Sequence, residues 1–247
     1  MELKKSLGQN FFNNPTLADK IVSFVDKKKP ESIVEIGPGG GYFTERLLII
    51  TPDLTLIEKD DALVNDLRVK YPQLTIYNED VLDFDYRKLK NLAKPTICFG
   101  ALPYNISKKI IQQCVQSYIF TDMFFIIQKE VAYDYINQNK KSSVLSTMNN
   151  IYADTKLLMI IKPGAFRPQP KVDSALIHLT SHKPIVEGKE NIMKLEKIIK
   201  QSFTAPRKTL RNNLKAYCNE KLDKYQSIRP EDLSLQDYLE ISQLIDV

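Results

Sequence analysis

The segment Phe99 to Ser107 is the most informative of the chain, and its central residues are Ala101, Leu102, Pro103 and Tyr104. They follow an apolar run, Thr96 to Phe99, that predicts a β-strand. In an open α/β sheet, ligands bind at the carboxyl ends of the strands. Pro103 fixes the backbone angle φ in this turn, and Tyr104 offers an aromatic ring to a planar guest. We expect that guest to be a nucleobase.

The turn is similar to the turn Asn/Asp-x-Pro-Tyr/Phe of enzymes that methylate the exocyclic amine of adenine. Ala101 stands where that pattern has Asn. The amine is a poor nucleophile because its lone pair is delocalised into the ring, so a site must hold the base and accept hydrogen bonds from its NH₂ group. Ala101 retains the backbone carbonyls and lacks the side-chain acceptor. By analogy with the loss of one preorganised polar group elsewhere, we expect an intact fold and turnover slowed by roughly 10²–10³.

A second candidate site lies at a glycine-rich turn that follows the expected strand Ser32 to Ile36. Gly37 and Gly39 allow a tight turn and close approach of a ligand to the start of the next helix. Such a turn is equally compatible with no ligand or with NAD. Glu58 ends the second expected strand, 21 residues after Gly37, and can accept ribose hydroxyls. Asp80 ends the third and can bond an adenine amino group, so three successive strand ends indicate a nucleoside cofactor.

Nicotinamide cofactors and S-adenosylmethionine both contain an adenosine that would use Glu58 and Asp80. Pro38 and Tyr42 break the Gly-x-Gly-x-x-Gly spacing typical of dinucleotide sites. The turn at 102–104 has no evident part in hydride transfer, and it fits a base held against a methyl donor. The sequence therefore favours S-adenosylmethionine.

The elements that must position these residues alternate between apolar runs and amphipathic stretches. This alternation predicts an α/β fold with a mostly parallel sheet and helices on both faces. The expected strands are Ser32 to Ile36, Leu54 to Glu58, Leu74 to Tyr77, Thr96 to Phe99, Met123 to Gln128, Leu157 to Ile161 and Ala175 to Thr180; the expected helices are Leu17 to Val25, Asp61 to Lys70 and Ser107 to Tyr118. The last two strands are too close for a crossover helix, so we expect an antiparallel end to the sheet.

The sequence changes to a helical pattern from about residue 184, which predicts a catalytic domain at 1–183 and a small all-helical domain at 184–247. The expected helices are Ile192 to Phe203, Lys208 to Tyr217 and Leu235 to Ile245. On the middle helix, Arg207, Arg211 and Lys215 recur at i, i+4 and i+8. We expect them to form one basic stripe available to RNA, with an apolar stripe opposite.

The net charge of +5 on 247 residues is unevenly distributed. Between Lys162 and Lys215, twelve Lys and Arg residues face four acidic ones, a balance of +8. Such a surface suits a phosphate backbone, and a solvated helical face is equally compatible with it.

Composition also limits the class of protein. The three cysteines are widely spaced and there are two histidines, so neither a disulfide framework nor a metal site is indicated. No apolar run approaches the length of a membrane span, and the amino terminus does not resemble a signal peptide. We expect a cytoplasmic protein with no membrane partner, and a monomer because no long apolar interface is evident.

Motifs along nearly the whole chain resemble the KsgA/Erm family of ribosomal RNA adenine N6,N6-dimethyltransferases, most closely the KsgA branch that acts on small-subunit rRNA. They are Lys4 to Phe11, Glu35 to Gly39, Glu58, Leu102 to Ser107, Gln128 to Val131, Pro170 to Ala175 and Arg207 to Asn212. The resemblance implies a Rossmann-like class I methyltransferase sheet with S-adenosylmethionine as methyl donor and no metal. It also implies dimethylation of two adjacent adenines near the 3′ end of 16S rRNA, with small-subunit rRNA or the immature 30S subunit as partner.

The resemblance also implies roles for particular residues. Tyr104 would stack on the flipped adenine, the Leu102 carbonyl would accept from its N6, and Phe166 would close the other face, since aromatic stacking repays roughly 1–3 kcal/mol per base. The cofactor would contact Asn10, Phe12, Gly37, Gly39, Glu58, Asp80 and Ala101, and RNA would contact Arg207, Lys208, Arg211 and Lys215.

Two positions depart from the family pattern. Ser143-Val144 stands where the family usually has Tyr-Gly, at the entrance of a helix. Ala101 leaves three interpretations open: a natural enzyme that tolerates the loss, an engineered inactive variant, or an assembly factor that binds the immature small subunit and methylates little. A mitochondrial transcription factor of the same fold is a further alternative, which no transit-type amino terminus supports.

Overall fold

The protein is described here by a computed structural model that covers residues 11–89, 95–136, 141–217 and 220–245. The chain divides into two units. Unit 1 comprises residues up to 132 together with 156–181, and unit 2 comprises 133–155 together with 182–247. The structure thus groups residues 133–155 with the helical tail, whereas the sequence placed one division near residue 184.

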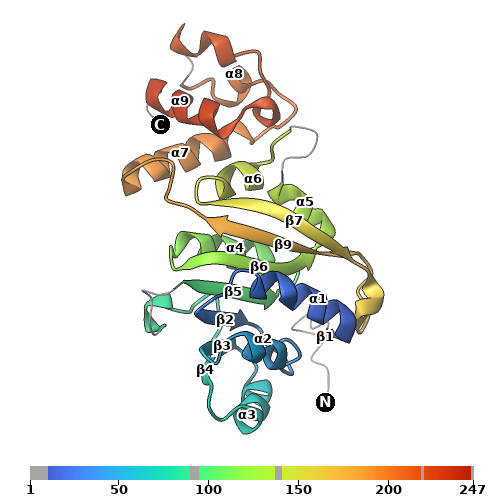
Figure 1. Ribbon diagram of the computed structural model, residues 1–247. Coiled ribbons are helices and arrows are strands. Elements are labelled where there is room, and N and C mark those ends of the chain that lie inside the picture. The colour runs from blue at the N-terminus through green and yellow to red at the C-terminus, as the bar shows by residue number, and fades with distance from the viewer. Residues whose placement is uncertain (1–10, 90–94, 137–140, 218–219, 246–247) are drawn as a thin grey trace. The chain divides into compact units, whose positions relative to one another are not determined.

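A seven-stranded sheet with the order β4-β3-β2-β5-β6-β9-β7 is the main feature of the fold, and Figure 1 shows the strands stacked in this order. The strands are β2 (Ser32–Ile36), β3 (Leu54–Glu58), β4 (Thr75–Asn78), β5 (Thr96–Ala101), β6 (Phe120–Gln128), β7 (Ala153–Ile161) and β9 (Ser174–Ser181). The pairs from β4 across to β6 are parallel, and β9 is antiparallel to β6. The predicted α/β class and the antiparallel strand are confirmed.

The order of the strands reverses direction between β2 and β5. Numbered among themselves, the seven strands follow the order 3-2-1-4-5-7-6, whose first five positions match the doubly wound α/β sheet. At this switch point Gly100 pairs with Ile36, and a Cβ atom on Gly100 would lie 2.9 Å from the Ile36 carbonyl oxygen. Ligands of such sheets bind beside the carboxyl ends of these two strands.

Helices cover both faces of the sheet. The helices of unit 1 are α1 (Pro15–Asp26), α2 (Thr44–Ile50), α3 (Asp61–Lys70), α4 (Ser107–Gln116) and the start of α5 (Lys129–Tyr135). Buried residues of α1, α2 and α3 share one core cluster with Ile33, Phe99 and Phe124. Cys98 points to the other face, where its thiol lies beside that of Cys114 from α4. Because both faces are covered, every residue of β2 is buried, including the polar Ser32 and Glu35 beside its apolar Ile33, Val34 and Ile36.

Side-chain caps fix where two of these helices begin. The Asn14 side chain accepts a hydrogen bond from the Leu17 backbone N–H at 3.0 Å, and Pro15 occupies the first helical position of α1. Asp60 likewise accepts from the Ala62 N–H at 3.0 Å at the start of α3. The cap at Asp60 lies two residues after Glu58, so it also fixes the chain just after the end of β3.

A separate two-stranded sheet joins β1 (Phe11–Phe12) and β8 (Phe166–Arg167), and the sequence did not predict it. The strands are antiparallel, with Phe12 opposite Phe166. The Asn13 N–H continues the pairing by donating to the Ala165 carbonyl at 2.7 Å. The start of the described chain is thereby attached to the loop that connects β7 and β9.

Unit 2 is helical apart from the first residues of β7. It contains α6 (Val144–Asn149), α7 (Lys189–Ser202), α8 (Leu210–Asn213) and α9 (Leu235–Leu244), and the 3-10 helices η4 (Glu220–Tyr225) and η5 (Pro230–Asp232); the 3-10 helices η2 (Tyr86–Lys88) and η3 (Pro163–Ala165) belong to unit 1. Ser143, one of the departures from the family pattern, forms a capping box with Ser146 at the entrance of α6.

The predicted helix from Lys208 to Tyr217 is wrong, because only the four residues of α8 are helical. The Asn213 side chain bonds both the N–H and the carbonyl of Ala205, each at 3.1 Å, and this fold-back replaces a continued helix. Leu210 and Leu214 are buried as the apolar pattern predicted.

No helix in the described part of the chain is long and apolar enough to cross a membrane.

Candidate active site

A cavity of about 580 Å³ lies at the carboxyl ends of β2, β3, β4 and β5. It lies within unit 1, and the predicted cofactor residues Phe12, Gly37, Gly39, Glu58, Asp80 and Ala101 all line it. Because parallel strands end at the same edge of a sheet, residues from separate parts of the sequence meet on one wall. Asn10 lies outside the described residues.

The glycine turn forms one side of this cavity. Gly37 has a φ of +64° and Gly39 a φ of +57°, a left-handed conformation that side chains rarely adopt. A Cβ atom on Gly39 would lie 3.0 Å from the ring of Phe11, which also lines the cavity. The Gly37 N–H donates to the Ile57 carbonyl at 2.9 Å, so β3 holds the turn in place.

Glu58 connects the end of β3 to the glycine turn. Its carboxylate accepts hydrogen bonds from the backbone N–H groups of Gly39 at 3.1 Å, Lys59 at 2.8 Å and Asp60 at 2.9 Å. Burial raises the pKa of Glu58, and these hydrogen bonds act in the opposite direction. A carboxylate offers about four acceptor positions, so capacity remains for a hydroxyl in the cavity.

Asp80 supplies a second carboxylate from the segment after β4. One oxygen accepts from the Leu82 N–H at 3.0 Å, and the other lies 2.6 Å from the Lys59 ammonium group. The hydrogen bond from Lys59 lowers the pKa of Asp80, which keeps this carboxyl ionised and available as an acceptor.

Glu35, at the end of β2, has no role in the sequence-based account of the site, although it lies on the cavity wall. Its side chain is almost fully buried and accepts a hydrogen bond from the Thr44 hydroxyl at 2.6 Å. Burial raises its pKa to about 8, and the nearby Glu58 carboxylate adds to that rise. Glu35 is therefore mostly neutral at pH 7, which reduces negative charge beside Glu58.

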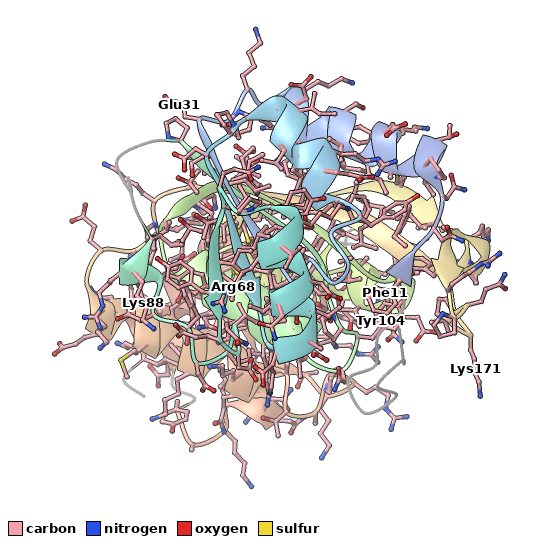
Figure 2. The ribbon with its side chains drawn as sticks, turned by 90° about the horizontal axis from the view of Figure 1, so that it is seen from below. Phe11, Glu31, Arg68, Lys88, Tyr104 and Lys171 are labelled. Atoms are coloured by element: carbon pink, nitrogen blue, oxygen red, sulfur yellow. The ribbon has the colours of Figure 1, made fainter. Side chains whose placement is uncertain are left out.

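The turn after β5 borders the same cavity. Ala101 and Pro103 line the wall, whereas the Leu102 side chain is buried and its N–H donates to the Ile126 carbonyl at 3.0 Å. Tyr104 is half-buried just beyond the wall, with its hydroxyl 2.6 Å from that of Ser174. In the view of Figure 2, Tyr104 and Phe11 fall in the same region of the ribbon.

Phe166 does not line the cavity, and its expected role of closing the other face of the target base stays a prediction. Its ring is 2% exposed and meets the ring of Phe12 edge-on, with centroids 5.1 Å apart. The antiparallel pairing of β1 with β8 places the Phe12 ring between Phe166 and the cavity. Phe11 and Phe12 are the aromatic residues that this pairing presents at the wall.

The predicted RNA-binding residues belong to unit 2. Arg207, Lys208, Arg211 and Lys215 are all exposed. Only Arg211 lies in α8, so the four residues do not form a stripe on one helix.

Four residues of the site were given no role from the sequence: Phe11, Glu35, Thr44 and Ser174. Phe11 and Glu35 lie in the family motifs Lys4 to Phe11 and Glu35 to Gly39, which were the signals that could have found them. The fold brings Thr44 to Glu35 and Ser174 to Tyr104, and no spacing in the sequence indicates either pair.

The residues on the wall fit an adenosyl cofactor. The glycine turn leaves room for close approach, and Glu58 and Asp80 present carboxylate acceptors with hydrogen-bonding capacity remaining. The described residues hold no group of His, Cys, Asp and Glu side chains that could bind a metal ion.

This strand order, with a glycine turn after the first strand and acids after the second and third, defines a Rossmann-like class I methyltransferase fold. Two solved structures share it. The 23S rRNA methyltransferase ErmE has a TM-score of 0.75 at 22% identity and covers 95% of this chain and 100% of its own. A dimethyladenosine transferase from Plasmodium falciparum has a TM-score of 0.76 at 19% identity, and the match covers 95% of this chain and 99% of that protein's chain.

The family follows from closer sequence similarity. The model of the family "Ribosomal RNA adenine dimethylase" matches residues 1–247. The ribosomal RNA small subunit methyltransferase A of Marinobacter nauticus is 37% identical over 99% of this chain and 92% of its own length. The protein of that name from Coxiella burnetii is 34% identical over 100% of this chain and 99% of its own. The chain belongs to the ribosomal RNA adenine dimethylase family.

Proposed function

We propose that this protein dimethylates N6 of two adjacent adenines near the 3′ end of 16S rRNA during assembly of the small ribosomal subunit. Family membership supports the reaction, and the names of the relatives from Marinobacter nauticus and Coxiella burnetii support the small subunit as its target. The observation that carries the proposal is the position of the turn 101–104, which borders the cavity that Glu58 and Asp80 line.

Each side of the cavity has a separate task in this proposal. Glu58 accepts the ribose hydroxyls of S-adenosylmethionine, and Asp80 accepts the adenine amino group. When bound, the cofactor supplies a methyl group on a positively charged sulfur. Gly37 and Gly39 keep the wall free of side chains so that the ligand can approach the backbone.

The turn after β5 holds the target base. The Tyr104 ring stacks on the extruded adenine, and the Leu102 carbonyl accepts a hydrogen bond from N6. Extraction of a base costs a few kcal/mol, which stacking can largely offset. Orientation of N6 toward the methyl group supplies much of the acceleration, so no side chain need act as general base and the proton can leave to water.

Incubation with radiolabelled S-adenosylmethionine and small subunits from a strain that lacks this methylation tests the proposal. The expected result is label in N6,N6-dimethyladenosine at two adjacent positions of 16S rRNA. Label in large-subunit rRNA, or none in adenine, contradicts it. Naked 16S rRNA in parallel shows whether the RNA or the assembled subunit is the substrate.

A second candidate function is that of an assembly factor that binds the immature small subunit and methylates little. Ala101 favours it, because this side chain lines the cavity where the pattern of adenine methyltransferases has an amide acceptor. This function predicts salt-sensitive binding to immature subunits that persists without S-adenosylmethionine. Absence of such binding rules it out.

A further inference from the structure

Tyr104 is fixed at two points in the structure. The Ser107 hydroxyl donates to the Tyr104 carbonyl at 3.2 Å, and the Tyr104 hydroxyl lies 2.6 Å from that of Ser174. The first contact holds the backbone from the start of α4, and the second holds the far end of the ring. The hydroxyl contact restricts χ1 of Tyr104, so the fold sets the direction in which the ring extends and the place of its far end.

Ser174 is itself rigidly placed. It is fully buried and is the first residue of β9, opposite Gln128 at the end of β6. The Lys129 N–H donates to the Asp173 carbonyl at 3.0 Å, which extends the pairing by one bond. The Asp173 carboxylate lies 3.4 Å from the Lys129 amine and 3.0 Å from that of Lys162. The hydroxyl of Ser174 therefore has little freedom to follow the ring if the ring moves.

We propose that Ser174 is a positioning residue for methyl transfer, which holds the Tyr104 ring in the place needed to stack on the target adenine. The inference rests on the proposed function. A fully buried side chain cannot touch the RNA, so Ser174 acts through Tyr104. Alanine at position 174 leaves the far end of the ring free to move about χ1, and a small misplacement of a bound group can slow a reaction strongly.

A double-mutant cycle tests the proposal, with single-turnover methyl transfer to immature small subunits as the measurement. We expect S174A and Y104F each to slow the step roughly fivefold to tenfold, as expected for loss of one neutral hydrogen bond, with unchanged affinity for S-adenosylmethionine. The double variant S174A/Y104F should be no slower than either single variant, because all three lack the same bond. Multiplying effects would overturn the proposal, since they show that the two hydroxyls act independently.

Ser32→Ala is the matched control, because Ser32 is also a buried serine at the first residue of a strand, at the other end of the sheet. It should leave the rate unchanged. Thermal unfolding of each variant shows whether S174A remains folded. If S174A does not remain folded, Y104F still tests the proposal, because it removes the same bond from the half-exposed side. A rate of methyl transfer by Y104F equal to that of the parent would then overturn the proposal.

A second readout separates this inference from the proposed function. An RNA hairpin with 2-aminopurine at the target adenine reports stacking by fluorescence quenching without methyl transfer. S174A should weaken the quenching and leave hairpin affinity within about twofold of the parent. The variant Ala101→Asn restores the amide that the pattern of adenine methyltransferases has at this position. If neither the parent nor this variant transfers methyl groups, the proposed activity fails. If methyl transfer occurs and S174A changes neither rate nor quenching, the role of Ser174 alone fails.

Discussion

The carboxylate of Glu58 accepts a hydrogen bond from the backbone N–H of Gly39 at 3.1 Å, across 19 residues of sequence. This bond joins the end of β3 to the glycine turn after β2. The acid that we assign to the ribose therefore also holds the turn that the cofactor approaches. Loss of its charge should affect both tasks.

Glu58→Gln should weaken binding of S-adenosylmethionine by roughly tenfold to a hundredfold, because an amide has one acceptor oxygen and its NH₂ group faces backbone donors. Isothermal titration calorimetry measures the change. Glu31→Gln is the control, since Glu31 is exposed and lies away from Tyr104 and Phe11 in Figure 2. Equal affinities for E58Q and the parent would contradict the assignment.

Gly39→Ala should lower the free energy of unfolding by about 1–2 kcal/mol, the cost of a left-handed conformation for a residue with a Cβ atom. It should also weaken cofactor binding, because the new methyl group would lie 3.0 Å from the Phe11 ring. Gly40→Ala is matched to it, as Gly40 has no positive φ and a Cβ there meets nothing within 4 Å. Urea unfolding that gives equal stabilities for both variants would refute this account.

Stability should decrease as pH rises from about 5 to 8, because Glu35 has a pKa of about 8 in the folded protein against 4.5 as its ordinary value. The folded state holds a proton that the unfolded state releases, so the stabilisation is complete below pH 4.5 and is lost toward pH 8. Glu35→Gln cannot ionise and should reduce the drop in melting temperature between pH 5.5 and 8.5. Glu190→Gln is the control, because Glu190 is exposed on α7, and it should leave that drop in melting temperature unchanged. An unchanged pH dependence in E35Q would count against a buried neutral carboxyl at position 35.

Ala101→Asn should raise the rate of methyl transfer, by up to roughly 10²–10³, because it restores the amide acceptor for the adenine NH₂ group. Ala101→Leu adds a side chain of similar size without an acceptor and should give no gain. Rates from labelled S-adenosylmethionine and melting temperatures would be measured together. If A101N is as slow as the parent while still folded, our account of this position is wrong.

The double variant Arg207→Ala/Lys208→Ala should weaken binding to immature small subunits and reduce the slope of log affinity against log salt by about 1 to 2, since each phosphate contact releases counterions. Filter binding at several salt concentrations measures the slope. Lys20→Ala, an exposed change on α1, is the control. An unchanged slope would remove these two residues from the RNA surface.

Much of unit 1 was predictable because local pattern and tertiary environment agree there. The strands β2 and β3 and the helix α3 begin and end where the apolar pattern placed them. Acids at strand ends could be grouped into one site because parallel strands end at one edge. Their convergence on the cavity follows from topology alone.

Tertiary contacts decided the features that the sequence did not indicate. The spacing of Leu210 and Leu214 suggested a helix, yet a turn held by Asn213 buries the same two residues. An aromatic residue at position 166 could face a ligand or the core, and only the pairing of β1 with β8 places it in the core. Contacts between residues far apart in sequence, such as Tyr104 with Ser174, leave no periodic signal.

The late position of β9 in the chain has a consequence for biosynthesis. The cavity is lined by residues between Phe11 and Ile110, so its wall can be translated well before the chain reaches Ser174. Phe11 and Phe12 reach that wall only when β8 has emerged to pair with β1, and Tyr104 gains its partner Ser174 when β9 folds back on β6. A product that terminates before β8 would therefore lack both the pairing that places Phe11 and Phe12 at the wall and the hydroxyl that holds Tyr104.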